Sequence, residues 1–104
     1  MARFDVYANP DSAEKELIPF YLDVQNDHVK GLQTRVVVPL WNADLMPTRA
    51  EELNPLFDIA GQHVVMDTPA IGAVPASVLR HAVSNLAADQ LRIQDALDTL
   101  FGSY

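Results

Sequence analysis

The chain has 104 residues, 49% of them hydrophobic and 20% charged, so it is long enough to bury a core and too apolar to be disordered. Its 14 acidic and 7 basic residues give a net charge of −7, and the basic residues form no cluster, which argues against binding nucleic acid through its phosphates. The absence of cysteine excludes disulfides and thiolate metal sites, and no apolar run approaches the roughly 20 residues of a membrane helix. We therefore expect one cytoplasmic domain over residues 1–104, with neither a membrane nor nucleic acid as a direct partner.

The first third of the chain predicts three short strands. Residues 4–7 form the first strand, which ends at the turn dipeptide Asn9-Pro10. Apolar and polar residues alternate over 20–25, which is the period of a half-buried strand. The valine-rich run 35–38 ends at Pro39 and predicts a central strand covered on both faces.

The middle of the chain is more irregular. Residues 48–53 are suited to one short helical turn, and 68–75 are a segment punctuated by prolines. Between them, the apolar runs 56–59 and 63–66 flank Ala60-Gly61-Gln62, which predicts a β-hairpin.

The last third predicts a helix. Residues 76–101 contain neither glycine nor proline, and apolar residues recur there at three-and-four spacing. The start of the helix is open, because Ser77 and Asn85 are both possible N-caps. The apolar stripe consists of Val83, Leu86, Ile93, Leu97, Leu100 and Tyr104, with a polar member at Gln90. Strands followed by one helix predict an α+β fold with an antiparallel sheet.

No constellation of side chains in the sequence requires an active site. His28, His63 and His81 are far apart and lack the spacing of metal ligands, and the glycines form no phosphate-binding loop. Adjacent carboxylates such as Glu51-Glu52 lie in polar stretches and are typical of solvated side chains. We therefore expect a binding protein rather than an enzyme, with no cofactor and no metal.

The end of the chain predicts a surface for a partner. Leu100, Phe101 and Tyr104 lie close together with no later segment to cover them, and exposed apolar surface usually marks an interface. Asp95, Asp98 and the terminal carboxylate also oppose the helix dipole. The alternative is that Leu100 and Phe101 belong to the core and that Tyr104 is disordered.

Seven short motifs follow one another along almost the whole chain. They are Phe4-x-Val6-Tyr7, Tyr21-Leu22-Asp23-Val24-Gln25-Asn26-Asp27, Arg35-Val36-Val37-Val38-Pro39-Leu40, Leu53-Asn54-Pro55, Val65-Met66-x-Thr68, Val74-Pro75-Ala76-Ser77-Val78 and Ile93-Gln94-Asp95-Ala96-Leu97. In this order and spacing they resemble the CcdB toxins of type II toxin–antitoxin systems. The resemblance extends from about residue 3 to residue 101.

The resemblance implies a fold and an assembly. The fold is a small SH3-like antiparallel β-barrel with a small additional sheet and a C-terminal helix. The assembly is a homodimer in which the two C-terminal helices lie near the twofold axis. The dimer interface is then expected to include Ile93, Leu97, Leu100 and Phe101.

The resemblance also implies a function. Toxins of this family bind the A subunit of DNA gyrase and trap the enzyme on cleaved DNA. A cognate antitoxin neutralises the toxin with a flexible C-terminal segment, and the pair represses its own operon. Such a toxin acts by stabilising one state of its target rather than by chemistry.

The residues that correspond to the two family surfaces can be named in this chain. The gyrase-facing residues are His28, Val29, Asp98, Phe101, Gly102, Ser103 and Tyr104. The antitoxin-facing residues are Tyr7, Ala8, Asn9, Trp41, Asn42 and Asp44. We hypothesise that Asp98 and the Tyr104 carboxylate pair with arginines of the target, and that Phe101 or Tyr104 supplies an aromatic contact.

The chain departs from the family pattern at its end. That pattern closes with Phe-Trp-Gly-Ile, whereas an ungapped match gives Phe101-Gly102-Ser103-Tyr104 and places glycine at the tryptophan. Sliding the match by one residue aligns Phe101 with the tryptophan and Gly102 with the family glycine. Two alternatives therefore stay open: a relative that binds antitoxin but has weak or no gyrase activity, and an endoribonuclease toxin on the same fold. The ribonuclease needs cationic groups around a phosphate, which the net charge of −7 disfavours.

Overall fold

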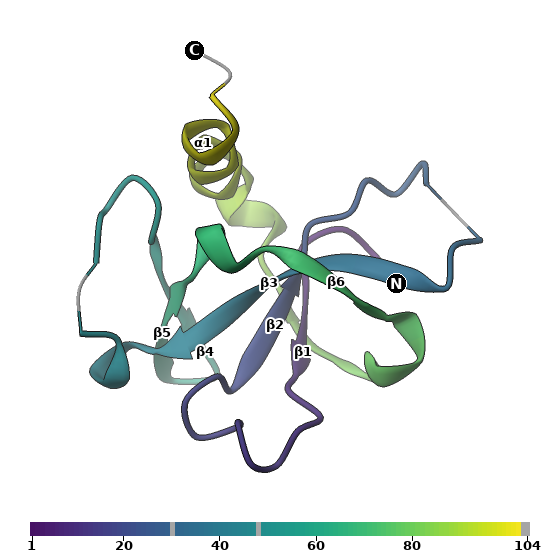
Figure 1. Ribbon diagram of the computed structural model, residues 1–104, viewed down its shortest axis with the longest axis horizontal. Coiled ribbons are helices and arrows are strands. Elements are labelled where there is room, and N and C mark those ends of the chain that lie inside the picture. The colour runs from purple at the N-terminus through teal and green to yellow at the C-terminus, as the bar shows by residue number, and fades with distance from the viewer. Residues whose placement is uncertain (30, 48, 103–104) are drawn as a thin grey trace.

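The structure, a computed structural model, describes residues 1–29, 31–47 and 49–102. Within these residues the chain forms short strands, 3₁₀ turns and one α-helix (Figure 1). The strands are β1 (Asp5–Ala8), β2 (Phe20–Asp23), β3 (Thr34–Asn42), β4 (Leu56–Ile59), β5 (Gln62–Met66), β6 (Gly72–Pro75) and β7 (Ala82–Asn85). The helix is α1 (Gln90–Phe101), and the 3₁₀ turns are η1 (Ala43–Leu45), η2 (Thr68–Ala70), η3 (Ala76–Val78) and η4 (Ala87–Asp89).

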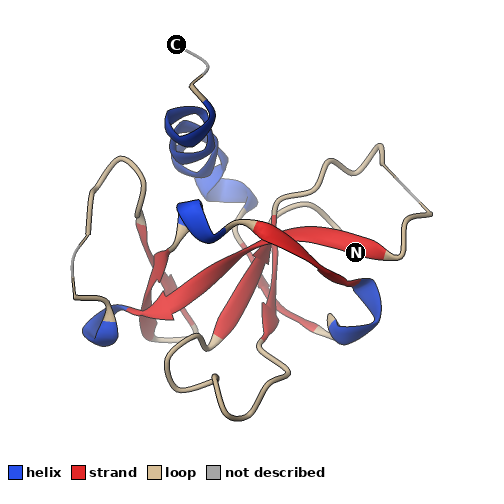
Figure 2. Ribbon diagram, viewed as in Figure 1, coloured by secondary structure: helices blue, strands red, loops and turns tan. Residues whose placement is uncertain are grey.

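The strands form one antiparallel sheet in the order β4-β5-β3-β2-β1-β7, and β6 pairs with β3 beside this path. β3 changes partner along its length, because residues 34–37 pair with β6 and residues 40–42 pair with β5. The sheet therefore curls around β3 into a half-barrel, and α1 stands against one side of it (Figure 2). This is the α+β architecture that the resemblance predicted. The β4–β5 hairpin extends this sheet, because β5 pairs with the end of β3.

Pro39 does not end the third strand, so that prediction was wrong. β3 continues through Pro39 to Asn42, and Pro39 lies opposite Tyr21 of β2. The Pro39 carbonyl accepts a hydrogen bond from Asp67 N at 2.9 Å, so the proline nitrogen faces the same side. On that side the pairing with β6 has stopped and the pairing with β5 has not begun. The missing N–H therefore removes no bond from the ladder.

The hairpin predicted for residues 56–66 is confirmed. β4 and β5 pair up to Ile59 opposite Gln62, which leaves a two-residue loop. Ala60 and Gly61 both have positive φ values, 53° and 82°. Two consecutive positive φ values are what a type I′ turn requires, and this turn matches the natural twist of the strands.

The irregular segments on either side of the hairpin also acquire local structure. Thr48 lies outside the described residues, but Asn54 N donates to Ala50 O at 2.7 Å and closes one helical turn. The punctuated segment 68–75 folds into η2 followed by β6.

The C-terminal helix is shorter than its sequence spacing predicted. Residues 82–85 form β7, which pairs with β1, and α1 begins only at Gln90. Asn85 is therefore not the N-cap of α1; it is the last residue of β7, and its side chain accepts a hydrogen bond from Ala87 N at 2.8 Å. The helical spacing of Val83 and Leu86 was misleading. Val83 lies in β7, at the irregularity in its pairing with β1, and Leu86 follows β7 and donates its N–H to the Phe4 carbonyl at 2.9 Å.

Each face of the sheet carries a buried cluster. On one face Ile93, Ala96 and Leu97 of α1 join the main core. On the other face a smaller cluster gathers around Tyr7, Val37 and Leu79. The central strand β3 is therefore covered on both faces, as predicted from its valine run.

Tyr7 makes the stability of the fold sensitive to alkaline pH. Its side chain is 2% exposed, and burial, reinforced by the charges of Asp5 and Asp23, raises the pKa of Tyr7 to about 12. The unfolded chain releases this proton near pH 10, so the folded state holds it more tightly than the unfolded state does. The contribution of the protonated Tyr7 hydroxyl to the free energy of unfolding is fully present below about pH 10, and it is lost as the pH rises towards about 12. We expect the free energy of unfolding, measured with urea, to fall by on the order of 2 kcal/mol over this interval.

Tyr7→Phe provides the control for this expectation, since phenylalanine keeps the ring and removes the proton. Only the difference in stability between the two proteins reports on Tyr7, because contributions that both proteins share cancel in it. Equal losses of stability in Tyr7→Phe and the unaltered protein would contradict the assignment.

Candidate functional site

The first predicted gyrase-facing segment lies in a tight turn after β2. Figure 1 shows the loop that carries this turn, between β2 and β3, on the same side of the sheet as α1. Asn26 builds the turn, because its side chain accepts from His28 N at 2.9 Å and its carbonyl accepts from Val29 N at 3.0 Å. The His28 side chain is exposed and Val29 is 42% exposed, so both are available for contact with a partner.

The second predicted segment lies at the end of α1. Phe101 is 67% exposed, and Asp98 is partly exposed one turn earlier. Gly102 ends the helix in the left-handed conformation, with φ 71°, and its N–H donates to the Asp98 carbonyl at 2.8 Å. Glycine takes this conformation without the strain that a side chain would bring. Ser103 and Tyr104, which were also predicted to face gyrase, lie outside the described residues.

Arg3 connects the backbone before the 26–29 turn with α1, and no pattern in the sequence indicated this connection. Its Nε donates to the Val24 carbonyl at 3.1 Å, and its Nη2 donates to Gln94 Oε1 of α1 at 3.3 Å. Arg3 and Gln94 are 91 positions apart, so no periodicity or local motif relates them.

A buried ion pair anchors the segment that leads into the 26–29 turn. The fully buried Asp23 carboxylate accepts from Arg35 Nε at 2.8 Å and from Gln25 N at 3.0 Å, and Arg35 Nη2 lies 2.7 Å from it. Burial raises the pKa of the Asp23 carboxyl, and the hydrogen bonds from Arg35 and Gln25 limit that rise. Arg35 Nη2 also lies 3.9 Å from Asp27 at the edge of the turn.

Two of the four residues expected in a dimer interface are enclosed by their own subunit. Ile93 is fully buried and Leu97 is 7% exposed, because the apolar stripe of α1 faces the sheet. They leave almost no side-chain surface for a second copy. Leu100 is half-buried and Phe101 is exposed, so these two residues remain available. Leu91, which was not predicted, is the most exposed large apolar residue of α1 at 78%.

The predicted antitoxin-facing residues gather at the opposite end of the sheet. There the ends of β1 and β3 flank the start of β2. Asn9 N donates to Pro19 O and Asn42 N donates to Leu17 O, both at 2.9 Å, so one loop holds both ends. Of the six residues, Tyr7 and Asn9 are buried, Ala8, Trp41 and Asn42 are half-buried, and Asp44 is exposed. Tyr7 and Asn9 are therefore buried beneath this edge and do not form its outer surface.

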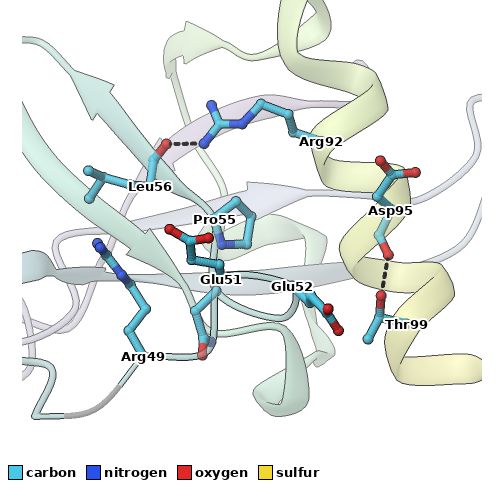
Figure 3. A pocket seen from close by; sticks show the side chains of 9 residues that line it. Arg49, Glu51, Glu52, Pro55, Leu56, Arg92, Asp95 and Thr99 are labelled. Carbon is cyan, nitrogen blue, oxygen red and sulfur yellow. Dashed lines mark hydrogen bonds between the residues drawn. The ribbon is translucent and has the colours of Figure 1, made fainter.

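An open cavity of about 810 Å³ lies between the 49–56 segment and the outer face of α1. Figure 3 shows Arg92 reaching across it to the Leu56 carbonyl, to which its Nη2 donates at 2.6 Å. The guanidinium also lies 4.6 Å from the centre of the Phe57 ring and 3.4 Å from Asp89. Of the two aspartates one turn from Arg92, only Asp89 has this contact. Asp95 instead accepts from the Thr99 hydroxyl through its backbone carbonyl.

Two other features, a metal site and a membrane-spanning helix, were searched for among the described residues. Within 1–29, 31–47 and 49–102, no three His, Asp or Glu side chains are arranged to hold a metal ion. No helix in the same ranges has the length and apolar character needed to cross a membrane.

The comparison with protein families agrees with the arrangement of these elements. A family model described as CcdB protein matches residues 3–102, which include the whole sheet, the 26–29 turn and all of α1. The chain belongs to the CcdB family, a family of toxins of toxin–antitoxin systems.

Proposed function

We propose that this toxin binds the A subunit of DNA gyrase and traps the enzyme on cleaved DNA until a cognate antitoxin neutralises it. The observation that carries the proposal is the presentation of two segments, the 26–29 turn and the end of α1, on one side of the sheet (Figure 1). Together they expose His28, Val29, Asp98 and Phe101. Such a surface acts by binding. A toxin that binds the gyrase state with cleaved DNA more tightly than the other states of gyrase increases the population of that state.

The geometry of the helix end favours Phe101 as the main aromatic contact. A tryptophan at the position of Gly102 would have to adopt φ near 71°, which is unfavourable for any residue with a side chain. Phe101, in contrast, is the last helical residue and projects its ring into solvent. This supports the match in which Phe101 takes the place of the family tryptophan and Gly102 that of the family glycine.

The charge of the surface favours a cationic patch on the partner. Asp98 lies in the last turn of α1, where no basic residue compensates it among the described helical positions. Negative charge there is unfavourable beside the helix dipole, so an arginine from a partner would be stabilising. The net charge of −7 would also speed the approach of a positively charged surface.

The assembly and the control of the toxin belong to the same proposal. We propose a homodimer through α1 that uses Leu100 and Phe101, because these two of the four expected interface residues are not enclosed by the subunit. The antitoxin segment then binds at the edge formed by the ends of β1 and β3, and the toxin–antitoxin pair represses its operon. Cosedimentation with a synthetic antitoxin segment tests this edge, and an Asp44→Ala variant should weaken the complex.

The ribonuclease alternative has less support than gyrase binding. Three of the seven basic residues are committed to intramolecular contacts: Arg3 to Val24, Arg35 to Asp23 and Arg92 to Leu56. A nuclease on this fold needs free cations around the reacting phosphate. The side chains of Arg3, Arg35 and Arg92 are therefore already engaged within the subunit.

A cleavage assay with purified gyrase, supercoiled DNA and ATP tests the proposal. We expect linear DNA bound to gyrase to accumulate when the toxin is added, and to be absent when gyrase is omitted. Folded toxin that binds its antitoxin but produces no cleaved DNA would support the alternative of a relative without gyrase activity. Cleavage of RNA by toxin alone at low salt would support the ribonuclease.

Asp98 tests the charged part of the surface. Asp98→Ala is expected to weaken binding to the gyrase A subunit by at least about tenfold, because a hydrogen-bonded ion pair with a partner arginine is lost. Asp95→Ala is the matched control, since it removes the same charge from the side of α1 that borders the cavity. Calorimetric titration provides the affinities. Equal affinities of Asp98→Ala and the unaltered protein would remove Asp98 from the contact surface.

A further inference from the structure

Arg3 contacts the 26–29 turn and α1, the helix whose end forms the second segment of the proposed binding surface. Towards the turn, its backbone N donates to Asp27 Oδ1 at 2.7 Å and its Nε donates to the Val24 carbonyl at 3.1 Å. Towards the helix, its Nη2 donates to Gln94 Oε1 at 3.3 Å. One residue therefore holds both the backbone before the 26–29 turn and the exposed side of α1.

Gln94 extends this connection to the end of the helix. Its Nε2 donates to Asp98 Oδ1 at 3.0 Å, one turn further along α1. The amide thus accepts from a cation and donates to a carboxylate. The reverse orientation would place two donors face to face at Arg3 and two acceptors face to face at Asp98. The order of guanidinium, amide and carboxylate is therefore the one that satisfies all three groups.

The backbone before β1 directs Arg3 into this position. Phe4 has a positive φ of 73°, which is rare for a residue with a large side chain. Its ring is 4% exposed in the main core, its N–H donates to Asp23 O at 2.6 Å and its carbonyl accepts from Leu86 N at 2.9 Å. The Arg3 guanidinium lies 4.7 Å from the centre of this ring. A strained residue held by the core on both sides thus orients the arginine beside it.

We propose that Arg3 and Gln94 are positioning residues that hold the 26–29 turn and the end of α1 in the relative placement required for partner binding. This inference rests on the proposed function, because it assigns a purpose to the spacing between the two halves of that surface. Neither residue has to touch the partner. The relay formed by Arg3 and Gln94 sets the position of the turn through Arg3 and the direction of the Asp98 carboxylate through Gln94.

Binding measurements on full-length variants test the relay. Arg3→Ala and Gln94→Ala should each weaken binding to the purified A subunit of gyrase by about fivefold to tenfold, which is the usual range for residues that act through coupling. The double variant should be no weaker than about the worse single variant, because both changes break one connection. Arg80→Ala is the matched control, since it removes an exposed arginine outside the relay and should leave the affinity unchanged.

An exchange variant separates positioning from a general loss of packing. Arg3→Gln combined with Gln94→Arg places an arginine four residues before Asp98 and an amide at position 3, which recreates a connected order of donors and acceptors. We expect this exchange to recover most of the affinity lost in Arg3→Gln alone. A role in packing alone would make the two losses add.

Amide chemical shifts provide a readout that does not depend on gyrase. Gln94→Ala should shift the amide resonances of His28 and Val29, and Arg3→Ala should shift those of Asp98 and Gly102, while urea unfolding checks that each variant is folded. If the unaltered protein does not bind gyrase but these remote shifts occur, the proposed function fails and the relay stands. If the protein binds gyrase and both variants bind within twofold of it without remote shifts, the positioning inference is overturned and the proposed function stands. Should Arg3→Ala fail to fold, Gln94→Ala alone decides the question, since Gln94 lies on the partly exposed side of the helix.

Discussion

Replacing Asp23 with alanine is expected to lower the free energy of unfolding by about 3 to 5 kcal/mol, which is the usual consequence of breaking a buried ion pair. The carboxylate is fully buried and receives Arg35 Nε at 2.8 Å and Gln25 N at 3.0 Å. Without it, the Arg35 guanidinium is left in the interior with 9% of its side chain exposed. A domain of this size has a total stability of about 5 to 15 kcal/mol, so the variant should be close to unfolding. Urea unfolding followed by circular dichroism measures the loss.

A double variant shows whether the loss comes from the unpaired charge. Combining Asp23→Ala with Arg35→Met removes both charges, and the second change should restore part of the stability that the first one removed. Asp58→Ala, an exposed aspartate of β4, is the control and should change stability by less than about 0.5 kcal/mol. Losses that simply add in the double variant would mean that the pair is not coupled.

The single variant Arg35→Met should in addition depend on pH. Burial already raises the pKa of the Asp23 carboxyl, and removal of Arg35 takes away two of the interactions that oppose the rise. An acid with a raised pKa in the folded state favours folding at low pH, and this effect is lost as the pH rises through the folded value. The variant should therefore be destabilised less at pH 5 than at pH 8.

Replacing Phe101 with alanine is expected to weaken binding to the gyrase A subunit by at least about 30-fold while leaving the fold intact. The ring is 67% exposed, so its removal creates no cavity in the toxin. Aromatic residues at the centre of an interface often supply about 2 kcal/mol or more of the binding free energy, which corresponds to that factor. The stability of the variant should differ from that of the unaltered protein by less than about 0.5 kcal/mol.

Two other apolar residues serve as controls for Phe101. Leu45→Ala removes a side chain that is 44% exposed at the opposite end of the sheet, and it should leave gyrase binding unchanged. Ile93→Ala removes a fully buried side chain of the same helix, and it should lower stability by about 2 to 5 kcal/mol. Phe101→Ala would refute the surface if it bound gyrase within threefold of the unaltered protein.

The positions of the two predicted surfaces have a consequence for neutralisation. The 26–29 turn and the end of α1 lie on one side of the sheet, and the ends of β1 and β3 lie at its other end (Figure 1). An antitoxin bound only at the second edge would not cover Phe101. Neutralisation by blocking therefore requires a segment long enough to extend from one end of the sheet to the other.

Local sequence patterns determined a large part of the fold. The alternation over 20–25, the valine run in β3 and the two-residue loop at Ala60 and Gly61 each produced the expected element. These patterns are reliable because they reflect contacts between near neighbours in the chain, or a backbone conformation that few residues adopt. The order of the motifs was enough to identify the family.

The tertiary structure decided what the local patterns left ambiguous. Residues 82–85 fit helical spacing, yet they form β7 because the edge of β1 supplies hydrogen-bond partners that are distant in sequence. Proline usually ends a strand because it has no N–H to donate to the ladder. At Pro39, however, the nitrogen faces the side where pairing with β6 has stopped and pairing with β5 has not begun, so β3 continues. The stripe containing Ile93 indicated an apolar face without showing whether the sheet or a second copy covers it, and the sheet does.

The residues of the candidate site were also only partly predictable from the sequence. Sequence alone named His28, Val29, Asp98 and Phe101, because each corresponds to a position in the family pattern. It did not reveal Arg3, whose role depends on contacts with Val24 and with Gln94, far along the chain. The sequence thus determined which side chains are present and which local elements they form. Only the folded chain determined which of those side chains meet, since that depends on how the whole sheet curls and brings distant segments together.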